Sequence, residues 1–262
     1  MKKSYLSHMT WIEVQGIVKK RPTVLIPVGS TEAQNRHNPM GYDSLISQRL
    51  AEAAADKCNA VIAPVMPYGY SDIFVNFPGT ITLKPETLQA VFEDIIRSLI
   101  KTGFDHLLFI NNHDPNHVPL SNAASKLRDE TGIVCASIWP TTLARNFAQD
   151  IFENANKVLA HGDEPSTSLI KYLYPEMMRM DLVKEAPKPQ KFQNFELASV
   201  SALEHEGQKV PIFLRVDDVA KQGGWGNPSG DSEKGKIMFD RMVEFLITFV
   251  ARYNEINTHI DQ

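Results

Sequence analysis

Short apolar runs that alternate with helical patterns are the feature of this sequence that most restricts its fold. The first run, residues 23–30, is almost continuously apolar and ends in Gly-Ser, which is typical of a buried parallel strand. Three more strands are expected at residues 60–65, 106–111 and 132–139, with helices between them at 44–57, 84–102 and 118–130. Because this order builds right-handed crossovers, we predict an α/β fold, a three-layer αβα sandwich around a mostly parallel central sheet.

The second half of the chain contains no break that would mark a domain boundary. Residues 166–173 and 234–253 are predicted helices, and the longer one is amphipathic and is expected to pack back on the sheet. Residues 184–198 are rich in Lys, Pro and Gln and are interpreted as a surface excursion. The chain shows no internal repeat, so we predict one domain that spans residues 1–262.

The composition argues against several classes of protein. Among 262 residues, 27 are basic and 31 acidic, so the formal net charge is −4 and no basic surplus is available to bind nucleic acid. The first residues are too polar for a signal peptide, and no apolar run approaches the ~20 residues of a membrane span. The only cysteines, Cys58 and Cys135, are expected to be reduced thiols. We therefore expect a soluble cytoplasmic protein with no nucleic-acid and no membrane partner.

Polar side chains gather in the segments that follow the predicted strands. Ligands of open α/β sheets bind beyond the carboxyl ends of the strands, so a site is expected there. Carboxylates and imidazoles that converge at this edge are the ligands that a divalent cation requires. The candidates are Glu32, Gln34, His37 and Asp43 after the first strand, residues 111–117 after the third, Trp139 at the end of the fourth, and residues 161–164 beyond it.

Each candidate also has an ordinary structural interpretation. Asp43 lies just before a predicted helix, where an aspartate commonly caps the first turn. His113 could be a hydrogen-bonded loop histidine, and no short metal motif such as H-E-x-x-H supports it. His106 begins a strand and is therefore expected at the opposite end of the sheet.

The loop after the first strand carries a longer motif. Residues 27–43 read PVGSTEAQNRHNPMGYD and resemble the opening motif of the creatininase (creatinine amidohydrolase) family, P-V-G-S-x-E-Q-H-G-x-H-x-P-x-x-x-D. Further segments are similar to later motifs of the family, in the same order: FPGT at 77–80, NNHDPN at 111–116, HGDEPSTS at 161–168, and a last motif with GWGNP at 224–228 and EKG at 233–235. The chain is identified from these matches as a divergent member of the family.

The resemblance implies a metal-dependent hydrolase. Family members usually hold two divalent metals bridged by the motif aspartate, which corresponds to Asp43. The other ligands of the first metal correspond to Glu32 and His113, and two carboxylates with one imidazole suit Mn²⁺ as well as Zn²⁺. The catalytic histidine of the family corresponds to His161, which is expected to act as general acid/base.

The positions that serve only the second metal have all changed. The histidine that follows the motif glutamate in the family is Gln34 here, and the later acidic positions are Pro115 and Ser166. An amide oxygen is a poor substitute for imidazole, and proline offers no side-chain ligand. We therefore expect one divalent metal per chain, Zn²⁺ or Mn²⁺. A rebuilt second site is the alternative, with ligands drawn from His117, Asp114, Asp163 and Glu164.

The expected substrate is a small cyclic molecule, a cyclic amide or related ring, hydrolysed by a metal-activated water. Creatinine itself is not expected, because Lys157 stands where creatininase has a lid tryptophan. Relatives that open diketo-inositol rings offer an alternative reaction, and a metal-retaining binding protein without activity is a second alternative. The resemblance also implies a homo-oligomer, most simply a hexamer. The expected substrate contacts are Trp139, Asn116, Gln34 and His37.

Overall fold

A computed structural model describes residues 4–153, 155, 160–184, 188–226 and 230–260 of the chain. The predicted lid position, Lys157, and residues 227 and 228 of the last motif lie outside these ranges. In the described part of the chain, the structure contains no helix that is long and apolar enough to cross a membrane.

The centre of the fold is a four-stranded parallel sheet with the strand order β2-β1-β3-β4. Every residue of β1 is buried, as its continuous apolar sequence predicts. Leu25 of β1 lies opposite Ile62 of β2 on one side and Leu108 of β3 on the other. Since all pairings are parallel, the carboxyl ends of the strands meet at one edge. The strands are β1 (Thr23–Val28), β2 (Ala60–Ile62), β3 (Leu107–Asn111) and β4 (Ala136–Ile138).

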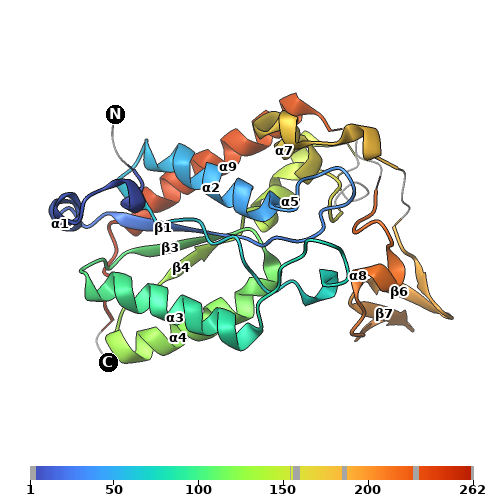
Figure 1. The fold of residues 1–262 in the computed structure, drawn as a ribbon, viewed down its shortest axis with the longest axis horizontal. Helices are drawn as coiled ribbons and strands as arrows, with labels where there is room; N and C mark the ends of the chain where they lie inside the picture. The colour runs from blue at the N-terminus through green and yellow to red at the C-terminus, as the bar shows by residue number, and fades with distance from the viewer. Residues whose placement is uncertain (1–3, 154, 156–159, 185–187, 227–229, 261–262) are drawn as a thin grey trace.

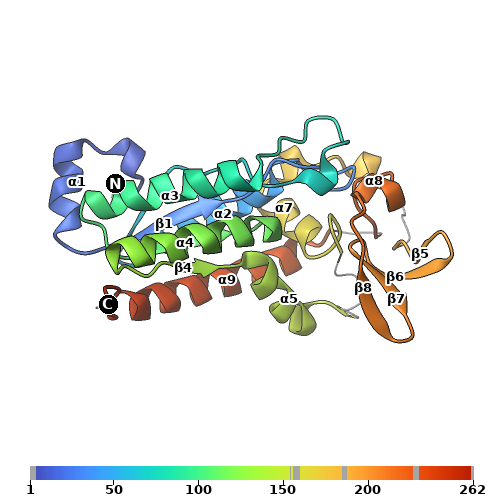
Figure 2. The ribbon, with the colours of Figure 1, turned by 90° about the horizontal axis from the view of Figure 1, so that it is seen from below.

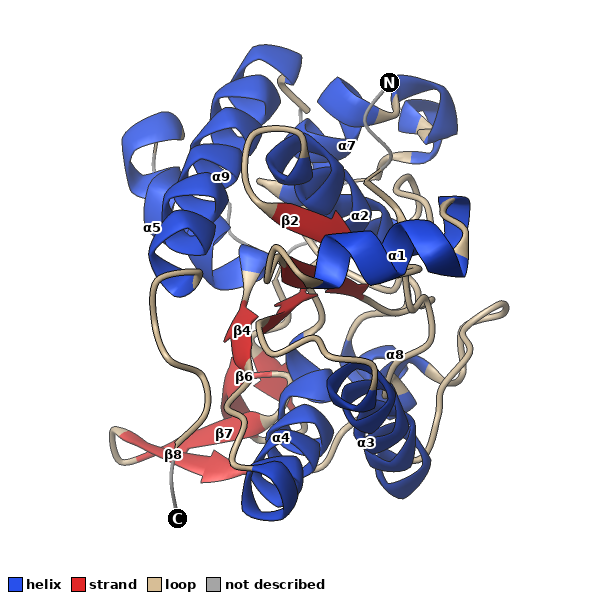
Figure 3. Cartoon of the chain, turned by 90° about the vertical axis from the view of Figure 1, so that its left-hand side faces the viewer, coloured by secondary structure: helices blue, strands red, loops and turns tan. Residues whose placement is uncertain are grey.

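Helices cover both faces of this sheet (Figures 1 and 3), and the predicted three-layer sandwich is confirmed. Leu25 joins the buried cluster on the face of α2 and α9, whereas Val24 and Ile26 join the cluster on the face of α3 and α4. Burial of each such side chain contributes roughly 1.5–3 kcal/mol. The helices of the two layers are α2 (Tyr42–Ala55), α5 (Pro140–Ile151), α7 (Ser166–Leu173) and α9 (Ser232–Tyr253) on the first face, and α3 (Pro85–Lys101) and α4 (His117–Thr131) on the second.

Several local expectations need correction. Helix α2 begins at Tyr42 with Gly41 as its N-cap, so Asp43 lies inside the first turn and does not cap the helix. Helix α1 (Trp11–Val18) and helix α5 are absent from the sequence-based expectation. The signal for α5 was present, since Pro140 occupies its first turn and Ala144 and Ala148 recur at helical spacing on its buried side.

The segment expected to be a surface excursion belongs to a second, antiparallel sheet with the strand order β5-β6-β7-β8 (Figure 2). Its strands project from the body beside the short helix α8 (Val216–Val219). The prediction of one domain over residues 1–262 is not tested by this arrangement and stays a prediction. The strands are β5 (Lys191–Phe192), β6 (Phe195–Ser199), β7 (Ala202–His205) and β8 (Gln208–Pro211).

Candidate metal centre

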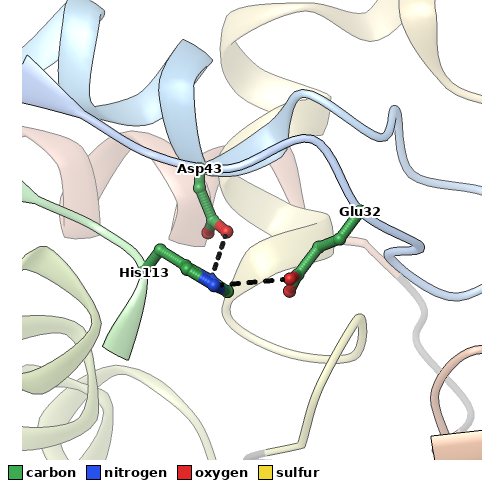
Figure 4. Close-up of side chains that lie close together, drawn as sticks. All are labelled: Glu32, Asp43 and His113. Carbon is green, nitrogen blue, oxygen red and sulfur yellow. Dashed lines mark ion pairs between the residues drawn. The ribbon is translucent and has the colours of Figure 1, made fainter. Parts of the chain in front are cut away.

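The predicted ligands Glu32, Asp43 and His113 come together at the carboxyl edge of the parallel sheet (Figure 4). His113 lies between the carboxylates, with Nδ1 3.2 Å from Asp43 Oδ2 and Nε2 3.5 Å from Glu32 Oε2. The three side chains are 1%, 5% and 4% exposed, in the order Glu32, Asp43, His113. Within the ranges that the structure describes, no other group of three or more His, Cys, Asp or Glu side chains suits a metal ion.

Asp43 is positioned by close packing of α2 against the end of β1. A Cβ on Gly29 would lie 2.3 Å from the backbone nitrogen of Ser44, so glycine is required for this approach. Ser30 donates a hydrogen bond to Asp43 Oδ2 at 2.6 Å, and Asn112 donates one to Oδ1 at 3.1 Å. These two hydrogen bonds fix the carboxylate with Oδ2 toward His113.

His113 follows β3, and the loop after β2 fixes its ring. Nε2 lies 2.8 Å from the carbonyl oxygen of Tyr70 and 3.3 Å from the hydroxyl of Ser71. A carbonyl oxygen only accepts, so the contact with Tyr70 places a hydrogen on Nε2 and leaves Nδ1 as the nitrogen available to a metal. Metal-binding histidines usually donate their second ring N–H in this way.

The electrostatics of the metal-free cluster also favour a cation. Burial raises the pKa of Glu32, and its buried Oε2 has no hydrogen-bond partner among the described residues. Burial alone would lower the pKa of His113, but the charges of Glu32 and Asp43 outweigh it and raise this pKa. A protonated imidazole thus compensates the carboxylates when no metal is bound. The donor set and the unpartnered oxygen fit a divalent ion such as Zn²⁺ or Mn²⁺.

Gln34 and His161 lie beside Glu32. Gln34 Nε2 donates a hydrogen bond to Glu32 Oε1 at 3.3 Å, and His161 Nε2 lies 3.9 Å from the same oxygen. The His161 ring stacks on Phe74 with centroids 4.5 Å apart, and its Nε2 donates to the carbonyl of Ala33 at 2.8 Å. Burial lowers the pKa of His161 and so favours the neutral ring. The predicted acid/base therefore adjoins the predicted ligands.

Trp139 and Asn116, two of the predicted substrate contacts, differ in their accessibility. Trp139 is partly exposed and meets the ring of His117 edge-on, with centroids 4.3 Å apart. Asn116 is fully buried, where it donates to the carbonyl of Gly29 and accepts from the backbone N–H of Tyr70. This geometry favours a structural role for Asn116, which ties the loop after β2 to the end of β1.

His37, a further predicted substrate contact, is almost completely buried. Its Nε2 lies 2.9 Å from the hydroxyl of Thr167 in α7, and burial lowers its pKa to about 4. These contacts favour a role in joining the loop after β1 to α7. His106, as expected, lies away from the site and contacts Asp105 and the carbonyl of Ile256.

The side chains considered as replacement ligands for a second metal do not join the cluster of Glu32, Asp43 and His113. Glu164 accepts hydrogen bonds from the backbone and hydroxyl of Ser168 and from the backbone of Gly230. Asp114 is exposed. The part of the chain that the structure describes therefore presents one cation site.

The sequence did not show which residues hold the candidate ligands in place. Ser30 lies two residues after β1, and Asn112, within the candidate segment 111–117, directly precedes His113; this proximity to the ligands was the available signal. Tyr70 acts through its backbone carbonyl, a contact for which the side chain gives no signal.

At the carboxyl edge of the parallel sheet, two buried carboxylates and one imidazole form a candidate site for a single cation, and a neutral histidine lies next to it. This arrangement is that of an α/β protein with a metal site of the hydrolase type. The chain belongs to the creatininase family, because the family model described as creatinine amidohydrolase matches residues 7–250.

The curated relatives are hydrolases. Creatinine amidohydrolase of Pseudomonas putida is 28% identical over 76% of this chain and 82% of its own length. A 3-dehydro-scyllo-inosose hydrolase of Thermotoga maritima is 27% identical over 68% of this chain and 58% of its own length. A mycofactocin precursor peptide peptidase of Mycobacterium ulcerans is 25% identical over 88% of this chain and 86% of its own length.

Solved structures support the fold. A putative creatinine amidohydrolase from Bacteroides fragilis superposes with a TM-score of 0.81 at 23% identity and covers 99% of this chain and 100% of its own. A manganese form of creatininase superposes with a TM-score of 0.80 at 21% identity, and a Zn-Zn form of a creatininase variant with 0.79 at 22%. These two cover 97% and 98% of this chain and 100% of their own.

Proposed function

We propose that the protein is a metal-dependent hydrolase of a small cyclic substrate, a cyclic amide or related ring, with one Zn²⁺ or Mn²⁺ per chain. The observation that carries the proposal is the buried cluster of Glu32, Asp43 and His113, in which one carboxylate oxygen has no hydrogen-bond partner in the described chain. A buried carboxylate oxygen that accepts no hydrogen bond is costly, and a divalent ion would reduce this cost. The Zn and Mn forms of creatininase support the choice of metals.

The chain supplies ligands and a proton acceptor. Asp43 Oδ2, Glu32 Oε2 and His113 Nδ1 would hold the ion, which when bound lowers the pKa of a water ligand and polarises a substrate carbonyl. His161 Nε2 carries its hydrogen toward the Ala33 carbonyl, so Nδ1 is the ring nitrogen that can take up a proton. The lowered pKa keeps this ring neutral and ready to act as a base.

Trp139 and Gln34 are the proposed substrate contacts. Trp139 is partly exposed directly after β4, at the carboxyl edge of the sheet, and would offer an aromatic wall for a ring. Gln34 is buried and directs its amide nitrogen to Glu32, and its amide oxygen is the atom that would accept a hydrogen bond from a polar substrate. Creatinine is not proposed as the substrate.

Hydrolytic opening of a diketo-inositol ring is the second candidate. The Thermotoga maritima relative, a 3-dehydro-scyllo-inosose hydrolase, supports it. A ring with adjacent carbonyl and hydroxyl oxygens can bind a single metal through two atoms, which suits a site with one cation.

A substrate screen on metal-replete protein tests the proposal. Elemental analysis is expected to give close to one metal per chain, and the screen should compare cyclic amides, lactones and inositol-derived ketones, with short peptides as a fourth class. Turnover of rings but not peptides supports the proposal, and peptide cleavage alone would replace it with a peptidase. A fully loaded protein that converts none of these classes would favour the non-catalytic alternative. The cytoplasmic location and the hexamer stay predictions.

A further inference from the structure

Gln34 donates a hydrogen bond to one oxygen of Glu32, whereas the other oxygen has no partner among the described residues. Gln34 Nε2 lies 3.3 Å from Glu32 Oε1, and the two side chains are 3% and 1% exposed. His161 Nε2 lies 3.9 Å from the same oxygen, but its hydrogen is directed to the carbonyl of Ala33. Glu32 Oε2 is the unpartnered oxygen and lies 3.5 Å from His113. The two oxygens of this carboxylate are therefore unequal.

The backbone on both sides of Gln34 is held in place. The carbonyl of Ala33 accepts from His161 at 2.8 Å, and the N–H of Asn35 donates to the carbonyl of Gly223 at 3.1 Å. Asn35 adopts a φ of 61°, and a Cβ on Gly162 would lie 2.6 Å from its Cβ, so glycine is required for this approach. Gln34 thus reaches Glu32 from a fixed position.

The chemistry of the contact fixes the orientation of the Gln34 amide. A glutamate that binds a cation is ionised, and an ionised carboxylate only accepts hydrogen bonds. The nitrogen end of the amide must therefore face Glu32, and the oxygen end must face away. Since the amide is neutral, it occupies Oε1 without adding charge to the cluster.

A donor on Oε1 affects how Glu32 can bind a cation. A carboxylate offers either one or both of its oxygens, and binding through both would break the hydrogen bond from Gln34. Zn²⁺ commonly takes four ligands, whereas Mn²⁺ commonly takes six and favours oxygen. A carboxylate restricted to one oxygen suits the smaller ligand set.

We infer that Gln34 is a positioning residue, which holds Glu32 so that Oε2 alone is offered to the cation and Zn²⁺ is favoured over Mn²⁺. Gln34 acts through Glu32 and is not itself a ligand. This role rests on the proposed single-metal site, and its test requires the metal ions alone.

A pair of variants on the same loop separates this role from general support of the fold. Gln34→Met removes the N–H donor and nearly preserves the shape of the side chain, and its thioether is a poor ligand for Zn²⁺ and Mn²⁺. Asn38→Leu is the matched control, because Asn38 is a buried amide that donates to Thr167 and Gly162. Burial raises the pKa of Glu32 and a hydrogen bond from Ser71 lowers it, and both variants retain Ser71.

Competition with chromophoric chelators, followed until binding is constant in time, measures the affinity of the full chain for each metal. In Gln34→Met, the affinity for Zn²⁺ should fall by about 10- to 100-fold. The affinity for Mn²⁺ should fall by a smaller factor, because the freed Oε1 can join its larger ligand set. Asn38→Leu should leave the ratio of the two affinities unchanged.

A shorter amide provides a second variant if circular dichroism shows that Gln34→Met does not fold. Gln34→Asn keeps the polarity of the position but is one methylene too short to reach Glu32, and it should change the ratio in the same direction. An unchanged ratio in the Gln34 variants, or an equal change in Asn38→Leu, would overturn the inference. A wild-type protein that binds neither metal would remove the metal site itself and the proposed function with it.

Discussion

Asp43 contributes charge as well as geometry to the metal centre. Its two oxygens accept hydrogen bonds from Ser30 and Asn112 while Oδ2 faces His113, so the shape of the site depends on neighbours that Asp43→Asn leaves in place. A neutral amide cannot balance a cation, and we expect metal affinity to fall by about 100-fold or more and activity to be lost with it. Elemental analysis after dialysis against a defined free metal concentration measures the change. Retention of one equivalent would contradict the assignment.

His161 is expected to behave differently, because we propose it as the acid/base beside the candidate ligands and not as a ligand. His161→Ala should leave the metal content unchanged and reduce turnover by about 10²–10⁴-fold. The residual activity should also lose the pH dependence that comes from the ring. Metal analysis and kinetics on the same preparation separate the two effects. If the variant loses the metal, His161 is a ligand. If it keeps both the metal and full turnover, another group is the base.

The candidate ligands were assigned from the resemblance to the family motifs, and strand order adds only that residues after neighbouring parallel strands meet at one edge of the sheet. Glu32, Asp43 and His113 follow two neighbouring parallel strands, and the structure brings their side chains together as expected. The roles of buried polar residues could not be predicted in the same way. Asn116 has the residue type of a substrate contact, but its partners are backbone groups whose positions depend on the packing of the whole loop.

At the level of elements, the packing of α2 on β1 offers a sharp test. The Cβ of Gly29→Ala would approach the backbone of Asp43 and Ser44 to 2.6 Å and 2.3 Å, so α2 must move. We expect a loss of roughly 1–3 kcal/mol of stability together with weaker metal binding, because Asp43 moves with the helix. Urea unfolding and metal titration measure the two effects.

Gly16→Ala is the matched control. Gly16 lies inside α1, and a Cβ there would meet no atom within 4 Å. Alanine favours a helix over glycine by about 0.5–1 kcal/mol, so this change should stabilise the protein slightly and leave metal binding unchanged. Similar losses in both variants would mean that the packing argument for Gly29 is wrong.

Elements with a buried face were the predictable part of the fold. The strands of the parallel sheet are apolar on both sides, and α3 and α9 each have one apolar stripe. The pattern of apolar residues in the sequence therefore locates them. The β5–β8 strands alternate apolar and charged residues over only two to five positions, a pattern too short to separate from a loop. The Lys, Pro and Gln content of residues 184–198, which include β5 and most of β6, led to the surface-excursion interpretation.

For the molecule as a whole, the free energy of unfolding is expected to change with pH differently with and without bound metal. Without metal, the pKa of His113 is raised by Glu32 and Asp43 despite burial. The unfolded histidine loses its proton near pH 6.5, whereas the folded one keeps it, so the unfolded state binds fewer protons above this pH. The free energy of unfolding should therefore fall as pH rises above about 6.5, by at most ~1.4 kcal/mol per pH unit for this group.

Bound metal should remove or reverse this trend, because ligand binding requires His113 and Glu32 to lose their protons. Unfolding curves from pH 6 to 9, with chelator and with excess metal, provide the comparison. Metal-free His113→Gln should also lack the decline, which separates this residue from the other titrating groups. A metal-free protein that gains stability over this range would refute the assigned charge state of the cluster.

The near-complete enclosure of the three ligands has a consequence for how quickly the ion is exchanged. Because the three candidate ligands are at most 5% exposed, we expect release of a bound cation to be slow and to require movement of the loops that carry them. Chelators should then strip the protein slowly, and at a rate independent of their concentration. The identity of the metal found after purification would then depend more on the ions available while the protein was synthesised and folded than on the ions in the buffer.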